Sequence, residues 1–110
     1  MPTLTPEERI LRAIKEDDLL TYVIENARWL RWKIHHIRNS KEGVVQGDVG
    51  FPDVIIGRSG RLIASELKTE TGKLTDGQAA WMDVFLKAGV EYYIWRPCAM
   101  KNGDIERYLR

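Results

Sequence analysis

The 110-residue sequence predicts an α/β fold whose elements follow the order helix, strand, strand, strand, helix, strand. The length predicts one domain over residues 1–110, because a single core usually takes roughly 100 to 150 residues. Apolar side chains recur at three- and four-residue spacing in two segments, and short β-branched runs separate and follow them. A right-handed crossover through the second helix would place the last strand parallel to the third, in a mixed four-stranded sheet with flanking helices.

The first helix is predicted from Pro6 to about Arg31. Thr5 offers a capping hydroxyl, and proline suits the first helical position because its missing N–H has no partner there. Two apolar sets follow at helical spacing, with acidic residues around Asp17 between them. We therefore expect an interruption of this helix near Asp17.

Three strands are expected next. Trp32 to Arg38 alternates around apolar residues and predicts the first strand, and residues 39–50 are expected to form a loop. Residues 51–56 and 61–68 are rich in β-branched and apolar side chains, with the turn-forming residues 57–60 between them. This pattern predicts a β-hairpin.

The rest of the chain predicts a helix, a strand and a short final helical turn that begins at Asp104. Thr75 and Gln78 form a capping-box signature at the start of the helix, and Gly89 ends it. The last strand is expected over residues 90–95 and stops at Pro97.

Composition excludes several classes of protein. The single cysteine, Cys98, rules out an internal disulfide framework and a multi-cysteine zinc site, and it favours the cytoplasm. No segment approaches the roughly 18 apolar residues of a membrane span, so no membrane association is expected. The net charge of +1 by itself favours no partner.

Basic side chains gather between residues 28 and 41, where no acid occurs and where aromatic residues are interleaved with them. They fit contacts to nucleic-acid phosphates, and they fit a solvated strand edge equally well. His35 and His36 lie in the same stretch, and at most one can enter a site because neighbouring strand residues face opposite ways. Lys73, in a glycine-containing loop, is a further candidate for DNA contact. The basic patch comprises Arg28, Arg31, Lys33, Arg38 and Lys41.

The register of the hairpin points to chemistry. If Ser59 and Gly60 form a two-residue turn, Asp53 and Glu66 lie directly opposite each other. Opposed like charges destabilise a sheet, but a divalent cation would make the two carboxylates a ligand pair. Lys68 points to the same face as Glu66 because side chains alternate along a strand. This trio fits metal-assisted hydrolysis of a phosphodiester, and its alternative is a surface hairpin with a weak ion pair.

Several motifs follow one another in a specific order. They begin with Asp48-Val49-Gly50-Phe51-Pro52-Asp53, Glu66-Leu67-Lys68 and Gly72-Lys73-Leu74-Thr75. Gln78, Trp81, Gly89-Val90-Glu91 and Trp95-Arg96-Pro97 complete the series. Together they resemble the VRR-NUC family of the PD-(D/E)XK nuclease superfamily, over roughly residues 16–97. The resemblance implies a restriction-endonuclease-like αβββαβ core.

The resemblance also implies a role for each matching position. Asp53 and Glu66 would bind a divalent metal, Mg²⁺ or Mn²⁺, with the carbonyl of Leu67 as a further ligand. Lys68 would be the catalytic lysine, and Gln78 the family glutamine near the site.

A glutamate on the first helix belongs to the same family pattern. Counting back from Ala27 places it at Glu16. Here the chain departs from the family, because Leu30-Arg31-Trp32 stands where Leu-Gly-Trp is usual. Asp17, Asp18 and Glu25 compete for the role, and a solvated helix acid is the alternative interpretation of Glu16.

The resemblance implies a metal-dependent endodeoxyribonuclease that cuts structured or branched, junction-type DNA. Small members of the family resemble phage proteins, so a homodimer in the cytoplasm of a bacterial host is expected, with neither a nucleotide cofactor nor a membrane partner. Two alternatives stay open at this point: a non-catalytic DNA-binding or assembly module on the same fold, and a nuclease for RNA.

Overall fold

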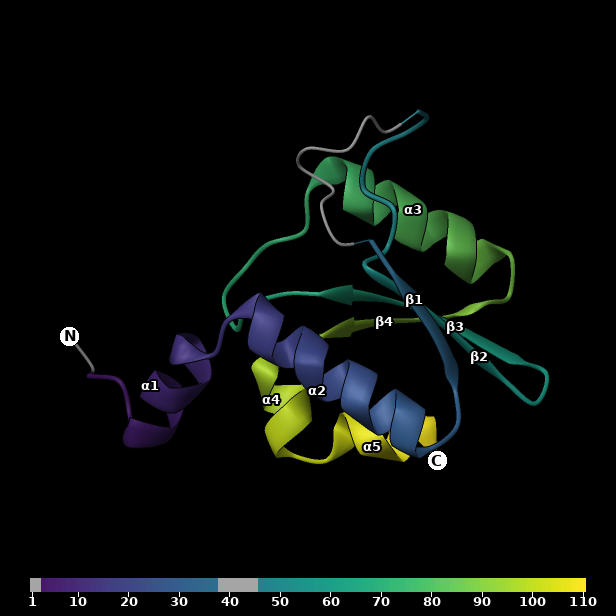
Figure 1. Ribbon diagram of the computed structural model, residues 1–110. Helices are drawn as coiled ribbons and strands as arrows, with labels where there is room; N and C mark the ends of the chain where they lie inside the picture. The colour runs from purple at the N-terminus through teal and green to yellow at the C-terminus, as the bar shows by residue number, and fades with distance from the viewer. Residues whose placement is uncertain (1–2, 38–45) are drawn as a thin grey trace.

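A computed structural model describes residues 3–37 and 46–110. A four-stranded sheet in the order β1-β2-β3-β4 lies between two layers of helices (Figure 1). β1, β2 and β3 are antiparallel and β4 is parallel to β3, which confirms the predicted α/β fold and its mixed sheet. The elements are α1 (Pro6–Ala13), α2 (Glu16–Trp29), β1 (Lys33–His36), β2 (Val54–Arg58), β3 (Arg61–Leu67), α3 (Asp76–Lys87), β4 (Glu91–Trp95), α4 (Pro97–Lys101) and α5 (Asp104–Leu109).

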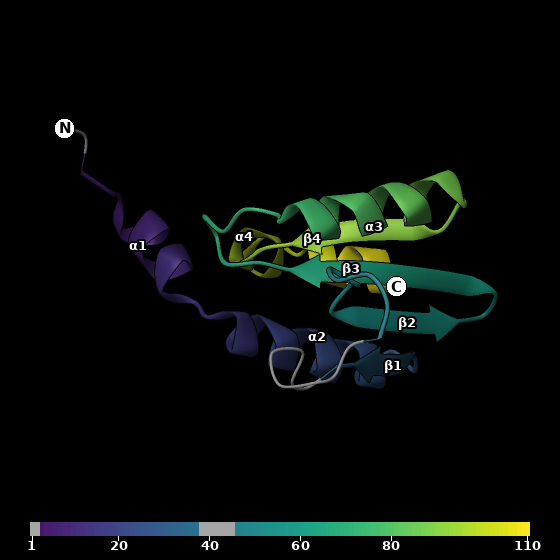
Figure 2. The same ribbon diagram turned by 90° about the horizontal axis from the view of Figure 1, so that it is seen from above.

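The predicted N-terminal helix is divided into α1 and α2, as expected, although the break lies slightly before Asp17. Ile14 has an extended backbone (ψ 126°) and ends α1, and α2 begins at Glu16. Thr5 caps α1 by accepting a hydrogen bond from the Glu8 N–H at 3.1 Å. Figure 2 shows α1 standing apart from the sheet, and no residue of α1 is buried.

The hairpin has the predicted register. Val54 pairs with Ser65 and Arg58 pairs with Arg61, so Ser59 and Gly60 form a two-residue turn. Both turn residues have positive φ (50° and 79°), the backbone that matches the twist of an antiparallel pair. β2 begins at Val54 rather than at residue 51, because the Asp53 side chain accepts the Leu67 N–H where a strand carbonyl would otherwise do so.

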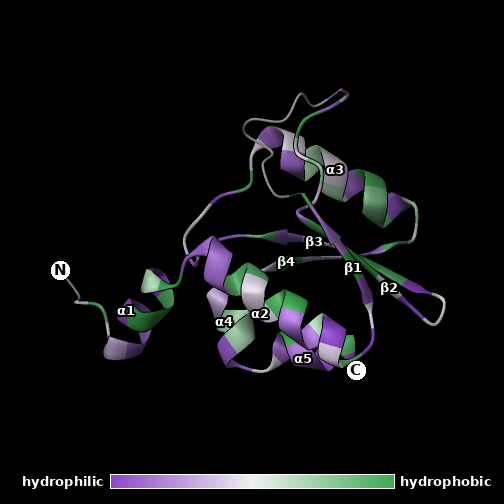
Figure 3. Cartoon of the chain, viewed as in Figure 1, coloured by the Kyte–Doolittle hydropathy of each residue, from purple (hydrophilic) through white to green (hydrophobic). Residues whose placement is uncertain are grey.

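The two faces of the sheet are covered by different helices. α2, α4 and α5 cover one face (Figure 1), where Val54, Ile56 and Trp95 join the main core. Polar and apolar residues alternate along α2 (Figure 3), and its buried residues are Leu19, Val23 and Ala27. α3 covers the other face. The sequence did not predict α4, because Pro97 was interpreted only as a strand stop, whereas it occupies the first turn of a new helix.

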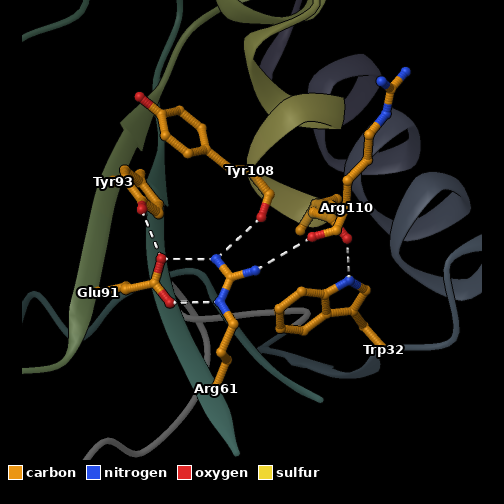
Figure 4. Close-up of polar contacts among 7 residues, drawn as sticks. Trp32, Arg61, Glu91, Tyr93, Tyr108 and Arg110 are labelled. Atoms are coloured by element: carbon orange, nitrogen blue, oxygen red, sulfur yellow. Dashed lines mark hydrogen bonds and ion pairs between the residues drawn. The ribbon is translucent and has the colours of Figure 1, made fainter. Parts of the chain in front are cut away.

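The C-terminal helix is tied to the sheet by a polar network (Figure 4). The Arg61 guanidinium pairs with Glu91 at 2.8 Å and donates to the carbonyl of Tyr108 at 3.1 Å. Trp32 Nε1 donates to the carbonyl of Leu109 at 2.7 Å. These contacts lie at the end of the sheet near the hairpin turn, which leaves the opposite end free for the functional side chains.

Candidate active site

Asp53 and Glu66 meet at the end of the hairpin remote from its turn. Glu66 is the next-to-last residue of β3 and only 2% exposed, and Asp53 immediately precedes β2. Asp53 Oδ2 accepts a hydrogen bond from the Leu67 N–H at 2.8 Å, which continues the strand pairing with a side chain. The predicted pairing of the two carboxylates therefore follows from the observed register.

Gln78 holds one oxygen of Glu66. Its Nε2 donates to Glu66 Oε1 at 2.7 Å, while its Oε1 accepts the Thr75 N–H at 2.9 Å. Thr75 Oγ1 in turn accepts the Gln78 N–H at 3.2 Å, so the predicted capping box both starts α3 and orients Gln78. Glu66 Oε2 is buried and has no hydrogen-bond partner among the described residues.

The burial of Glu66 changes its acid strength. Burial first, and then the nearby Asp53 carboxylate, raise the pKa of Glu66 to about 8. The positive charge of the Lys68 ammonium lowers the pKa of Glu66, and the negative charge of Glu16 raises it slightly. At neutral pH the metal-free pair therefore holds a proton. A divalent cation can replace that proton, and carboxylate oxygens are the ligands that Mg²⁺ prefers, so the free Oε2 fits such an ion.

Lys68 and Leu67 follow Glu66 at the edge of the sheet. Lys68 N donates to the carbonyl of Trp95 at 3.0 Å, so the strand geometry continues to this residue and the half-buried side chain faces the same way as Glu66. Leu67, with the backbone carbonyl that the sequence suggested as a ligand, is the last residue of β3.

Glu16 lies on the exposed first turn of α2, on an element that covers the other face of the sheet. Its negative charge raises the pKa of Glu66, but it is the smallest of the influences on that pKa. Within residues 3–37 and 46–110, no group of three or more His, Cys, Asp or Glu side chains is arranged to hold a metal ion. The structure thus brings together Asp53, Glu66 and Gln78 and leaves Glu16 at the margin.

Comparison with known proteins identifies the family. A family model for the VRR-NUC domain matches residues 8–97. The chain belongs to the VRR-NUC domain family. VRR-NUC domains are nuclease-type domains, and DNA is the substrate that such a domain implies.

Two solved structures have the same fold. A chain described as "VRR_NUC domain" is 21% identical, with a TM-score of 0.59 over 74% of this chain and 84% of its own length. Another, described as "VRR_NUC domain protein", is 24% identical, with a TM-score of 0.56 over 76% of this chain and 78% of its own. No curated protein sequence matches the chain.

A close contact between two glycines sets the distance between the Asp53 loop and α3 in this VRR-NUC domain. A Cβ on Gly50, which has φ +94°, would overlap the backbone of Gly77 and Gln78. A Cβ on Gly77 would lie 2.8 Å from the carbonyl oxygen of Val49. The sequence alone predicted no role for these two glycines. The only signal was the position of Gly50 just before the Phe-Pro-Asp motif.

Arg96 shapes the loop that follows Lys68. Its Nη1 donates to the carbonyls of Thr69 and Gly72, both at 2.7 Å. Glu70 Oε1 accepts the N–H of Cys98 at 3.0 Å, which ties the same loop to α4. Arg96 lies in the Trp95-Arg96-Pro97 stretch noted in the sequence, but its contacts are made across 24 or more residues and were not predicted.

The candidate DNA-binding residues occupy different places. Arg28, Arg31 and Lys33 are exposed near the hairpin-turn end of the sheet, since Lys33 pairs with Gly57. Lys33 lies roughly 13 Å along the strands from Asp53, at about 3.3 Å per residue, but on the same sheet face. Lys73 is exposed in the loop before α3. Arg38 and Lys41 fall outside the described residues.

Only one of the two histidines shares the face of the carboxylates. His35 pairs with Ile55, which places it on the Asp53 face by strand alternation, whereas His36 pairs with the core residue Val54. His35 is exposed. A groove of about 540 Å³, lined by Ile37 just after β1, reaches Asp53 and Gln78. The site is therefore accessible from the side of β1.

Proposed function

We propose that this VRR-NUC domain is a metal-dependent endodeoxyribonuclease that hydrolyses phosphodiester bonds in structured or branched, junction-type DNA. The observation that carries the proposal is the pairing of the half-buried Asp53 with the buried Glu66, which has a free carboxylate oxygen and a lysine beside it. A pair of like charges destabilises the fold unless a cation or a proton lies between them. Such an arrangement is typical of a functional site rather than of a stable surface hairpin.

Each residue would have a defined task. Asp53, Glu66 and the Leu67 carbonyl would hold Mg²⁺ or Mn²⁺, and Gln78 would keep Glu66 in place. The bound cation would lower the pKa of a water molecule and offset the charge of the phosphate. The Lys68 ammonium would stabilise the negative charge that develops on the phosphate oxygens. We keep Glu16, the first residue of α2, in the proposal as the acid that the family pattern places on the helix before the sheet.

The basic side chains suggest a path for the DNA backbone. Lys33 and His35 line the β1 edge on the face that carries Asp53. Lys73 is exposed in the loop that joins the carboxylate end of β3 to α3. Phosphates that follow this line would pass the carboxylates, with Arg28 and Arg31 extending the contact near the hairpin turn.

The proposal includes a homodimer, because cutting two strands of a junction requires two carboxylate sites. α1 offers a surface for pairing: Ile10 is 56% exposed, and the helix stands apart from the sheet (Figure 2). None of the helices in the described residues combines the length and apolar character needed to cross a membrane. A cytoplasmic protein of phage or prophage origin remains part of the proposal.

Cleavage assays test the function directly. Single-stranded, duplex, flapped and four-way-junction DNA, with RNA counterparts, would be incubated with Mg²⁺, Mn²⁺ or chelator. We expect divalent-dependent cleavage of at least one structured DNA, its loss in Asp53→Asn, and its retention in the matched control Asp48→Asn, which changes an exposed acid of the same loop. Cleavage that persists in chelator would contradict the metal assignment. Tight binding without cleavage would favour the non-catalytic module.

A further inference from the structure

Tyr92 carries a hydroxyl that the fold leaves unused. The residue lies in β4 opposite Ala64, and strand alternation places both on the α3 face with Glu66. Its side chain packs against Phe85, with ring centroids 6.0 Å apart, and the residue is 7% exposed. The hydroxyl is buried and has no hydrogen-bond partner among the described residues. Phenylalanine would fill the same space without this unfavourable burial, so packing alone does not explain the hydroxyl.

The surroundings of Tyr92 supply a matching acceptor. Glu66 Oε2, on the same face and one strand away, is also buried without a partner. Burial, together with the charges of Glu66 and Asp53, raises the pKa of Tyr92 to about 12. The phenol therefore keeps its proton at any ordinary working pH and can act only as a neutral donor or acceptor.

We propose that Tyr92 is a positioning residue of the carboxylate site, whose hydroxyl donates a hydrogen bond to Glu66 Oε2 when a divalent cation is bound there. This inference rests on the proposed function, because the cation would be held by Asp53 and Glu66. Gln78 Nε2 already donates to Oε1 of Glu66 at 2.7 Å, whereas Oε2 has no donor among the described residues. Tyr92 would supply the donor to this second oxygen. Outer hydrogen bonds of this kind orient metal ligands.

The test compares two neighbouring tyrosines on opposite faces of β4. Tyr92→Phe removes the unused hydroxyl, whereas Tyr93→Phe removes a hydroxyl that donates to Glu91 at 2.8 Å, away from the site. Calorimetry would measure Mn²⁺ and Mg²⁺ binding to both variants and to the wild type, and thermal unfolding in chelator would measure the stability of each metal-free protein.

We expect Tyr92→Phe to bind the metal 10- to 100-fold more weakly, roughly the effect of other such hydrogen bonds. Its melting temperature in chelator should equal or exceed that of the wild type. Tyr93→Phe should melt earlier and bind metal as the wild type does. In cleavage assays, excess metal should restore much of the rate of Tyr92→Phe.

Three results would overturn the inference in distinguishable ways. Equal metal affinity in Tyr92→Phe and the wild type would refute the role of Tyr92 and leave the proposed function intact. A clear loss of stability of Tyr92→Phe in chelator would show that the hydroxyl stabilises the metal-free fold instead. If the wild type binds neither metal, the metal-dependent function and the role of Tyr92 both fail.

Discussion

We expect Glu66 to make the free energy of unfolding depend on pH. Its pKa rises from the usual 4.5 to about 8 in the folded, metal-free protein, chiefly through burial and through Asp53. Because the folded state holds the proton more tightly than the unfolded state, this group stabilises the fold fully below pH 4.5. That stabilisation is lost as the pH rises through about 8.

Glu66→Gln isolates this contribution. A glutamine keeps the shape and accepts the hydrogen bond from Gln78, but it carries no charge at any pH. At about 1.4 kcal/mol per unit of pKa, the upper limit of the effect is roughly 5 kcal/mol. Because the site relaxes when Glu66 ionises, we expect roughly 2 to 4 kcal/mol. The variant should match the wild type near pH 4.5 and exceed it by that amount near pH 9.

Urea unfolding in chelator, at fixed salt and at several pH values from 4.5 to 9, measures the difference. Glu25→Gln, which changes an exposed acid on α2, is the matched control and should follow the wild type. If the free energies of unfolding of Glu66→Gln and the wild type run parallel over the whole range, Glu66 is not a buried, proton-holding acid. Asp53 and Glu66 would then not form a carboxylate pair in which a divalent cation could replace a proton.

Three further predictions concern the surroundings of the site. Gly50→Ala should lower the free energy of unfolding by about 3 kcal/mol or more in urea melts, because the new Cβ would overlap the backbone of α3. Gly60→Ala, which has positive φ but no atom within 4 Å of the new Cβ, should lower it by about 1 kcal/mol. Equal losses in the two variants would refute the close contact at Gly50. Arg96→Lys should lower the free energy of unfolding by about 2 kcal/mol, because the carbonyls of Thr69 and Gly72 would lose their donor. An unchanged urea melt would show that Arg96 does not hold this loop. The double variant Arg28→Gln with Lys33→Gln should flatten the salt dependence of DNA binding by roughly 0.9 log units per lost contact, and an unchanged slope would assign both residues to a solvated edge.

Much of the site could be predicted because local geometry determines it. The two-residue turn at Ser59 and Gly60 sets which residues of the hairpin face each other, and alternation then assigns the face of each side chain. The capping box of Thr75 and Gln78 likewise depends on residues only three apart. The pairing of Asp53 with Glu66 and the start of α3 follow from these two local features.

Other features depend on which distant segments pack together. The bond between Gln78 and Glu66 requires α3 to lie across the end of β3, and the contact of Gly50 with Gly77 sets that approach. The boundary at Pro97 was misjudged because a proline that ends a strand can equally begin a helix. The basic patch, continuous in sequence, runs through the end of α2 into β1, so its residues differ in distance from Asp53.

The sequence by itself determined the order of the four strands with α3 between the last two, the register of the hairpin and the resemblance to the VRR-NUC family. Each depends on spacing between residues close along the chain, where helical and strand periodicity dictate direction. Only the tertiary structure decided that Glu66 is buried with one free oxygen, and that the Tyr92 hydroxyl lies unused on the same face. Burial and unpaired polar atoms are decided by packing between elements, because the neighbours that exclude water come from segments far apart in the chain.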